Sequence, residues 1–139
     1  MRFMVLIPGN NEFEAGQLPP PEAIKAMTTY NEELVKAGVM LDGNGLRPTS
    51  KAVRVKFEGG KTVVTDGPFT EAKELVAGYW IWECKSQEEA TEWLKRAPFG
   101  GGVQIDIRQI QEPDDFAPID PTGELRAAEQ RVFNQLGGR

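Results

Sequence analysis

Two apolar runs along the chain predict central strands, residues 2–8 and residues 75–83. Each run carries apolar side chains on both faces of an extended backbone, which is typical of strands that are covered on both sides. Gly78 interrupts the second run and indicates a bulge or a close approach of another backbone. The two faces carry Phe3, Val5 and Ile7 against Met4 and Leu6 in the first run, and Val76, Trp80 and Trp82 against Leu75, Ala77, Tyr79 and Ile81 in the second.

Helical spacing predicts one helix over residues 22–37 and a second from residue 87 to about residue 96. Gly38 is placed to end the first helix, and Ser86 with Glu89 has the spacing of a capping box before the second. Asn31 interrupts the first apolar stripe, and belongs either to the helix edge or to the wall of a pocket. The expected inward residues are Ile24, Met27, Leu34 and Val35, flanked by Tyr30, and then Ala90, Trp93 and Leu94.

Shorter strands are predicted over residues 39–41, 52–58, 61–65 and 103–110. Alternation in residues 52–58 predicts one buried face and one wet face. Gly59-Gly60 between two alternating runs indicates a hairpin, because the tight turn needs positive φ. Residues 9–21 are predicted to form a loop, and Gly43 and Gly45 to be turn or bulge glycines.

The order of these elements predicts an α+β fold, a ferredoxin-like split βαβ protomer with an added hairpin. Two short helices cover only one face of a sheet, whereas residues 2–8 and 79–82 are apolar on both faces. The other face therefore needs a partner, and the sheet of a second copy is the simplest one. We expect a homodimer.

Residues 112–139 are predicted to be a linker and a helical extension of the domain formed by residues 1–111. Prolines and aspartates between residues 113 and 121 indicate an extended linker. Asp120-Pro121 suits the N-cap and first position of a final helix. The apolar stripe of that helix needs a partner in its own domain or on the other protomer, and consists of Leu125, Ala128, Val132 and Leu136, beside Phe133.

The composition restricts the chemistry that is available. The chain of 139 residues has a formal charge of −5, one Cys and no His, which excludes Ser–His–acid and Cys–His triads and zinc sites with imidazole ligands. The acidic balance argues against nucleic-acid binding, and no apolar stretch approaches the ~20 residues of a membrane span. The first residues lack a signal-peptide cleavage site, so we expect a cytoplasmic protein. We expect no metal site and no cofactor.

The segment from Thr65 to Tyr79, with Asp66-Gly67-Pro68-Phe69 near its start, resembles the signature of the YCII-related proteins, and of their DGPF subgroup in particular. The resemblance covers about residues 1–110 and leaves the tail outside. Further matching features are Arg2-Phe3-Met4-Val5-Leu6, Ala37-Gly38, Gly43, Gly45-Leu46 with Pro48, and Gly101-Gly102 before the last strand.

The resemblance implies a ferredoxin-like fold that dimerises into an α/β barrel, with a pocket near the interface between the two sheets. Some relatives carry a His–Asp pair proposed as catalytic, and one branch is implicated in dehydrochlorination of a chlorinated hydroquinone. The corresponding positions fall near Glu22-Ala23 and Ala97, where this chain has no His and, at the second, no acid. That activity is therefore not carried over. Members of the subgroup also occur beside or fused to extracytoplasmic-function sigma factors, which implies a regulatory partner.

Seven residues are candidates for binding a ligand, and they are Asp66, Phe69, Lys73, Glu74, Tyr79, Asp106 and Arg108. Asp66 either accepts backbone hydrogen bonds from Phe69 or Thr70 within the turn, or faces a ligand. Phe69 is expected to anchor the loop in the core. Lys73 and Glu74 are either solvated or paired, or they line a pocket.

The remaining candidates also have structural alternatives. Tyr79 belongs either to the core or interface, or to the floor of an aromatic-ligand pocket. Asp106 and Arg108 form a surface or interface ion pair, or orient a small acidic or hydroxylated ligand. Cys84 has no His to lower the pKa of its thiol, which argues against a catalytic thiolate.

These observations predict a dimer that binds an unidentified small molecule and is either non-catalytic or weakly specific, and the family resemblance implies a regulatory role. The alternative is a lyase, isomerase or dehydrochlorinase that uses Asp66, Glu74, Tyr79 or Arg108 in place of His. An enzyme of that kind needs a buried acid and base that converge and have shifted pKa values. Side chains that face solvent, or that are engaged in turns and ion pairs, would count against it.

Overall fold

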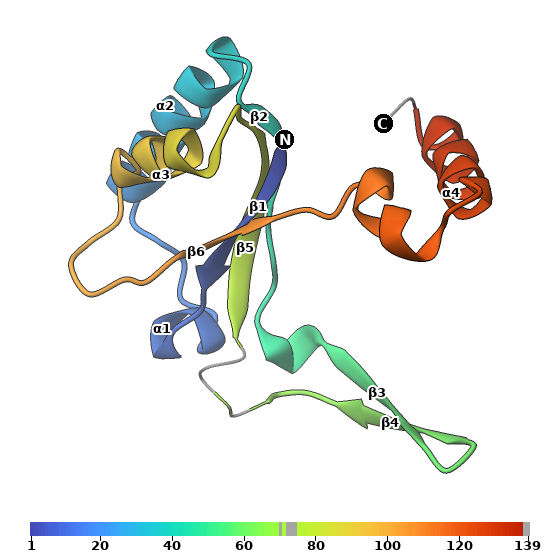
Figure 1. Ribbon diagram of the computed structural model, residues 1–139. Coiled ribbons are helices and arrows are strands. Elements are labelled where there is room, and N and C mark those ends of the chain that lie inside the picture. The colour runs from blue at the N-terminus through green and yellow to red at the C-terminus, as the bar shows by residue number, and fades with distance from the viewer. Residues whose placement is uncertain (70, 72–74, 138–139) are drawn as a thin grey trace. The chain divides into compact units, whose positions relative to one another are not determined.

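The computed structural model describes residues 1–69, 71 and 75–137 (Figure 1). The chain divides into two compact units, Met1–Gln109 and Ile110–Arg139. The first unit combines antiparallel sheets with helices, so the predicted α+β class is confirmed. Within the described residues the strands form two open sheets and no closed barrel.

Four strands form the main sheet in the order β2-β5-β1-β6, and every neighbouring pair is antiparallel. The two central strands are the predicted apolar runs, β1 (Arg2–Pro8) and β5 (Val76–Glu83). The edge strands are β2 (Met40–Gly45) and β6 (Asp106–Gln109). The last strand is shorter than the predicted 103–110 run, because pairing with β1 begins only at Asp106.

Helices α2 (Pro21–Lys36) and α3 (Gln87–Lys95) pack on one face of this sheet (Figure 1). The Tyr30 hydroxyl of α2 donates a hydrogen bond to the carbonyl oxygen of Trp93 at 2.5 Å, which ties the two helices together. The predicted stripe on α2 is partly wrong, since Ile24 and Val35 are exposed. The buried centre of the core consists of Phe3, Val5, Trp80 and Trp82 from the sheet and Tyr30, Leu34 and Ala90 from the helices.

The predicted helix ends are confirmed in their main features. Gly38 follows α2 with a φ of +74°, a conformation that glycine adopts without steric cost. Ser86 accepts a hydrogen bond from the backbone N–H of Glu89 at the start of α3. The Glu89 carboxylate accepts from the N–H of Lys85 rather than from that of Ser86, so the capping box is only half formed.

Glycines let β2 approach β5 closely. A Cβ on Gly78 would lie 2.9 Å from the carbonyl oxygen of Asn44, so the predicted close approach is confirmed. The register between β1 and β5 also shifts beside Gly78. Gly43 and Gly45 lie within β2, where they pair with Trp80 and Gly78, so neither forms the predicted turn, and the irregularity of β2 lies before them, between Met40 and Asp42.

The opposite face of the main sheet points away from α2 and α3. It carries the residues that alternate with the core positions of the central strands. In the register of these strands Met4 pairs with Ile81 and Leu6 pairs with Tyr79, which places four apolar or aromatic side chains together. We refer to Met4, Leu6, Tyr79 and Ile81 as the outer face.

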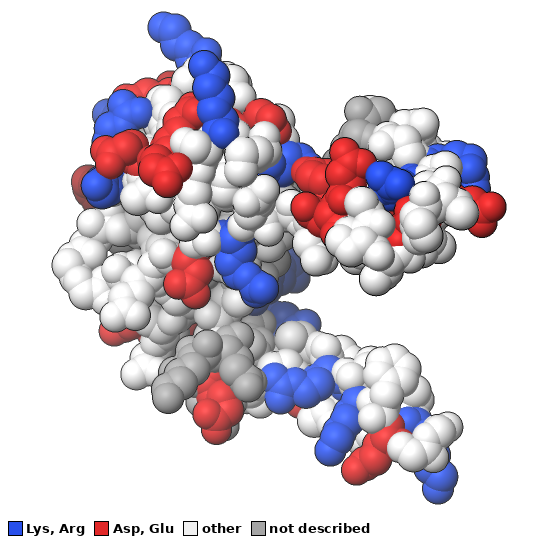
Figure 2. Space-filling view, viewed as in Figure 1, with Lys and Arg blue, Asp and Glu red and all other residues white. Residues whose placement is uncertain are grey.

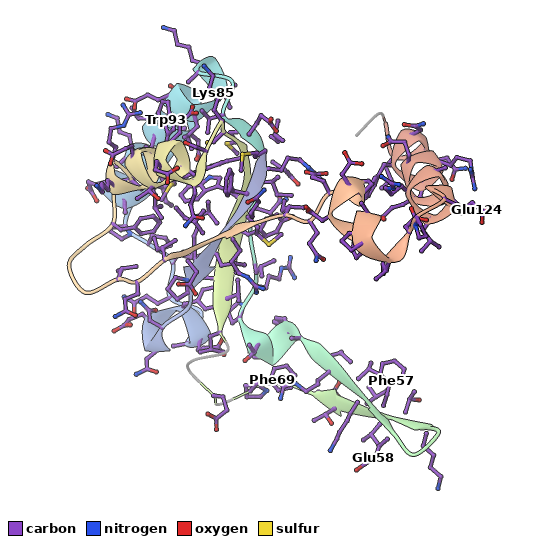
Figure 3. The ribbon with its side chains drawn as sticks, viewed as in Figure 1. Phe57, Glu58, Phe69, Lys85, Trp93 and Glu124 are labelled. Atoms are coloured by element: carbon purple, nitrogen blue, oxygen red, sulfur yellow. The ribbon has the colours of Figure 1, made fainter. Side chains whose placement is uncertain are left out.

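A second sheet is the predicted hairpin of β3 (Val53–Glu58) and β4 (Lys61–Asp66). Gly59 and Gly60 have positive φ in its turn, as expected. Every strand residue of the hairpin is exposed, so the predicted buried face of residues 52–58 is wrong. Phe57, labelled in Figure 3, has 82% of its surface exposed. The alternation of apolar and charged residues is present in β3, but among the described residues both faces of the hairpin are exposed.

The predicted loop over residues 9–21 contains a short helix, α1 (Asn11–Glu14). The Asn10 side chain caps it by accepting a hydrogen bond from the N–H of Phe13 at 2.8 Å. A single turn, η1 (Thr49–Lys51), precedes β3. Hydrogen bonds to the Glu14 carboxylate from the hydroxyl and the N–H of Thr49 connect this turn to α1.

The second unit consists of η3 (Pro113–Ile119) and α4 (Glu124–Gln135). The predicted extended linker is therefore wrong where η3 forms. Asp120 is not the N-cap, which is Gly123, but its carboxylate accepts the N–H groups of Leu125 and Arg126 at 3.1 and 3.0 Å. It also pairs with the Arg126 guanidinium at 3.0 Å. Asp120 thus accepts the otherwise unpaired N–H groups at the start of α4, although it lies before the N-cap residue rather than at it.

Candidate functional site

A cavity of about 340 Å³ lies beside Trp80, between the end of the main sheet and α2. We refer to it as the Trp80 cavity. Among the described residues that line it, none is Asp, Glu, Lys or Arg. The lining residues are Ile7, Pro19, Met27, Asn31, Met40, Gly43, Asn44, Gly45, Ala77, Gly78, Tyr79, Trp80 and Phe99. Such apolar walls with a few polar groups are typical of small-molecule sites.

Trp80 is held in place by its neighbours in the core. It points inward from β5 and meets the ring of Tyr30 edge-on at a centroid distance of 5.8 Å. Phe99 meets it in a similar way at 6.2 Å. The indole Nε1 donates a hydrogen bond to Oδ1 of Asn31 at 2.9 Å. Of the two alternatives for Asn31, the structure therefore places it on the cavity wall.

Two further hollows adjoin the Trp80 cavity, because they share Pro19 and Phe99 with it. One, of about 400 Å³, runs along α1 and the prolines that follow it. The other, of about 350 Å³, lies on α2 beside Pro98. Sequence reasoning missed Phe99, since a residue in a glycine-rich connector has no periodic pattern that would predict burial. The one available signal was a large aromatic side chain in a segment whose other residues are small.

Of the predicted site residues that the structure describes, Tyr79 lines the Trp80 cavity and the others do not. Its hydroxyl accepts a hydrogen bond from Nδ2 of Asn44 at 3.0 Å. Asn44 lies opposite Tyr79 on β2. Its Nδ2 also donates a longer hydrogen bond, at 3.4 Å, to Oδ1 of Asp42. The tyrosine thus belongs to the outer face and also borders the cavity.

Phe69 does not have its predicted place in the core, and of the two predicted donors to Asp66 only Phe69 lies within the described residues. The N–H of Phe69 donates to Oγ1 of Thr49 at 2.9 Å, not to Asp66. Phe69 is half-buried and lies outside the core, with the Arg54 guanidinium 3.9 Å from the centre of its ring (Figure 3). Thr49 can fix the turn because its hydroxyl binds Glu14 and Phe69 together. Lys73, Glu74 and Thr70 lie outside the described residues.

The turn requires glycine at position 67 because there is no room for a side chain there. A Cβ at Gly67 would lie 1.7 Å from the carbonyl oxygen of Thr49, which is far inside van der Waals contact. The N–H of Gly67 also donates to the carbonyl oxygen of Ala52 at 2.9 Å. Asp66-Gly67-Pro68-Phe69 is therefore packed against η1 as a structural unit.

Asp106 and Arg108 lie on β6, where they pair with Leu6 and Met4 of the outer face. Both side chains are exposed. Among the described residues, neither has an ion-pair partner, so the predicted pair between them is not formed. Their placement beside the outer face is as predicted, and the structure does not bring them to the Trp80 cavity.

Burial shifts the pKa of two groups in the core. It raises the pKa of the Cys84 thiol to about 11, with the carboxylates of Glu89 and Glu83 adding to the effect. Burial likewise raises the pKa of Tyr30 to about 12. Cys84 is therefore a neutral, unreactive thiol near pH 7. Neither residue lines the Trp80 cavity.

The described residues contain no cluster of three or more His, Cys, Asp or Glu side chains that could hold a metal ion. In the same part of the chain, no helix is both long and apolar enough to cross a membrane.

Comparison with known proteins places this chain in a family. The sequence model of the YCII-related domain matches residues 1–125. The chain belongs to the YCII-related family. The family resemblance is thus confirmed, and the match continues past residue 110, where the resemblance was expected to end. Membership in the DGPF subgroup stays a prediction.

Similar proteins leave the activity of this YCII-related chain open. An uncharacterized protein of Rhizobium meliloti (strain 1021) is 31% identical over 97 residues, covering 67% of this chain and 78% of the relative. A solved structure of a 5-chloro-2-hydroxyhydroquinone dehydrochlorinase from Burkholderia phenoliruptrix AC1100, in complex with 2,5-dihydroxybenzoquinone, is 16% identical. It covers 81% of this chain and 95% of its own, with a TM-score of 0.46. No activity follows from a likeness at that level.

Proposed function

We propose that this YCII-related protein binds a small, largely apolar molecule in the Trp80 cavity. The observation that carries this proposal is the cavity itself, of about 340 Å³ and walled by Trp80, Phe99 and two methionines. The methionines Met27 and Met40 have flexible side chains that adapt to differently shaped ligands. The absence of charged side chains among the described lining residues favours an uncharged ligand or an uncharged part of one.

The enzyme alternative has less support from the described residues. Proton transfer needs an acid or base within reach of the bound molecule. Among the described residues that line the cavity, Tyr79 is the one that can titrate, and its hydroxyl already accepts a hydrogen bond from Asn44. Asp66 and Arg108, which the enzyme hypothesis also used, do not line it. A binding role without catalysis therefore fits the site better.

The fold proposal is that ferredoxin-like protomers pair through the outer face to form a dimeric α/β barrel. The strand order β2-β5-β1-β6 and the two helices on one face support the first part. The apolar outer face supports the second, since Met4, Leu6 and Tyr79 are only half-buried in the single chain and a partner sheet would cover them further. A regulatory partner, such as a sigma factor, is the remaining part of this proposal and rests on family resemblance alone.

Ligand binding is tested with 1-indanone, a neutral bicyclic ketone, by following the indole N–H signal of Trp80 in proton–nitrogen NMR spectra. We expect this signal to shift on titration. Met27→Trp fills the cavity and should abolish the shift, because Met27 lines it. Val35→Trp is the matched control, since Val35 lies on the same helix with its side chain exposed. Equal binding to both variants, or none to the wild type, would refute the proposed site.

Dimerisation is tested by sedimentation of the wild type and of Leu6→Asp. The substitution places a charge in the centre of the outer face, so we expect the dimer to dissociate. Leu136→Asp introduces the same charge at an exposed position of the second unit and should leave the assembly unchanged. A wild type that sediments as a monomer at micromolar concentration would exclude the dimer.

A further inference from the structure

Asn31 has a fixed orientation in the wall of the Trp80 cavity. An asparagine side chain offers one acceptor and one donor group, and the two are often exchangeable by rotation. Here the indole Nε1 of Trp80, which can only donate, lies 2.9 Å from the side chain. The acceptor Oδ1 must therefore face Trp80, and Nδ2 takes the other position.

The donor group of Asn31 remains available to a ligand. Among the described residues, Nδ2 of Asn31 has no hydrogen-bond partner. The amide donor of Asn44, which also lines the cavity, is already engaged, since it donates to the Tyr79 hydroxyl. Asn31 is half-buried among apolar neighbours, including Met27 and Phe99. A ligand that excludes water from this wall would leave an amide N–H without a partner unless it supplies an acceptor.

We propose that Asn31 selects ligands that carry a ring carbonyl or hydroxyl oxygen, by donating a hydrogen bond from Nδ2 while Trp80 holds its Oδ1. The aromatic faces and edges of Trp80 and Phe99 fit a flat ring, and the amide reads one oxygen on that ring. This inference rests on the proposed function, because it names the ligand class of the same cavity. Asn31 is thus a specificity-determining residue whose position depends on Trp80.

The expected selectivity is about tenfold. A neutral hydrogen bond in a partly dry site favours the ligand that makes it by roughly 1–1.5 kcal/mol over one that leaves the donor unpaired, which corresponds to about a factor of ten in Kd. Apolar contact alone would not distinguish two ligands of nearly equal size.

The test compares 1-indanone with indane, which has the same bicyclic skeleton without the carbonyl oxygen. We expect the wild type to bind 1-indanone about tenfold more tightly. Asn31→Asp keeps an acceptor for the Trp80 indole but loses the donor, so the preference should disappear while the indole N–H signal of the free protein stays in its hydrogen-bonded range. Asn31→Leu removes donor and acceptor without adding a charge, and should also lose the preference.

Asn134→Asp is the matched control, because it makes the same chemical change on α4 in the second unit. It should keep the wild-type preference. Equal affinity of the wild type for both probes would overturn the role of Asn31 and leave the proposed cavity standing. A tenfold preference that survives in both Asn31 variants would also overturn it. If neither probe binds the wild type, the proposed function fails, and this inference fails with it.

Discussion

The central strands β1 and β5 and the hairpin of β3 and β4 are both extended, but they differ in sequence pattern and in burial. The central strands are apolar on both faces, whereas residues 53–58 alternate apolar with charged side chains. Phe3 on β1 is completely buried, whereas Phe57 on β3 is 82% exposed. The difference lies in what packs against each sheet, since α2 and α3 cover the central strands.

The charges follow the same division. The hairpin carries Arg54, Lys56 and Lys61 on exposed positions, and Lys56 lies 3.6 Å from Glu58 on the same strand (Figure 2). The interior of the main sheet carries no such groups among its described core residues. Alternation predicts an amphipathic strand in residues 53–58, and the apolar runs predict the central strands, but burial depends on elements that are distant in sequence.

The largest expected difference is between two identical substitutions. Phe3→Ala should lower the free energy of unfolding by about 3–5 kcal/mol, because it removes a buried ring and leaves a cavity. Phe57→Ala should change it by less than about 0.5 kcal/mol, as for an exposed residue. Urea denaturation followed by circular dichroism measures both. A cost of several kcal/mol for Phe57→Ala would show that another surface covers the hairpin in solution.

A second prediction concerns the base of the hairpin. Gly67→Ala forces the backbone apart, since its Cβ would lie 1.7 Å from the Thr49 carbonyl oxygen. We expect a local cost of about 1–3 kcal/mol, visible as faster amide hydrogen exchange in β4 and unchanged exchange in β1. Gly101→Ala is the control, because a Cβ there meets nothing within 4 Å. Uniformly faster exchange throughout the first unit would mean that hairpin and main sheet unfold together.

A third prediction concerns how the stability of the buried core depends on pH. The folded pKa of Cys84, about 11, is higher than its ordinary value of 9.0, so the native state holds the proton more tightly than the unfolded state. Stability is therefore complete below about pH 9 and falls as the pH rises from 9 towards 11. By pH 10.5 the loss from this thiol amounts to about 2 kcal/mol.

Cys84→Ala should make this alkaline loss shallower when unfolding is measured at pH 7.5 and 10.5. Tyr30→Phe should do the same at still higher pH, because the pKa of Tyr30 is raised from 10.0 to about 12. An unchanged slope in Cys84→Ala would contradict the burial of the thiol in solution.

The smallest expected effect is confined to the second unit. Burial opposes ionisation of Asp120, but the N–H groups of Arg126 and Leu125 and the Arg126 guanidinium outweigh it and hold the pKa of the carboxyl below its ordinary value. Its stabilising contribution is present above the unfolded pKa and is lost as pH falls through the lowered folded value. Asp120→Asn should therefore expose the N–H of Leu125 to faster hydrogen exchange at neutral pH.

Asp114→Asn provides the comparison for Asp120, because the Asp114 side chain is 94% exposed and lies 3.7 Å from the same arginine. It should leave the exchange of Leu125 unchanged. Similar effects of the two substitutions would mean that net charge, rather than the bonds of Asp120, stabilises α4.

Local patterns predicted most elements of the first unit. Several predictions that depend only on neighbouring residues were confirmed. They include the strands β1 and β5, the glycine turn of the hairpin and the Ser86 cap of α3. The short helix α1 and the turn η3 were missed, since their polar and proline-rich sequences are also compatible with loops.

The candidate site was harder to predict. Asn31 was noticed as a polar residue on an apolar stripe, but its partner Trp80 lies 49 positions away in the sequence. The N–H of Phe69, one of the two donors predicted for Asp66, binds Thr49 from a distant segment instead. Contacts of this kind depend on how the sheet is assembled, and no local spacing contains that information.

The exposed hairpin has one more consequence, for how copies of this chain behave at high concentration. Within the described residues β3 and β4 form a sheet of only two strands, so each has an unpaired outer edge. Unpaired edges of apolar strands can recruit other chains and start aggregation. Lys56 and Lys61 place positive charges along the two strands. We expect these charges to oppose the addition of one hairpin to the next and so to limit fibre formation at high concentration.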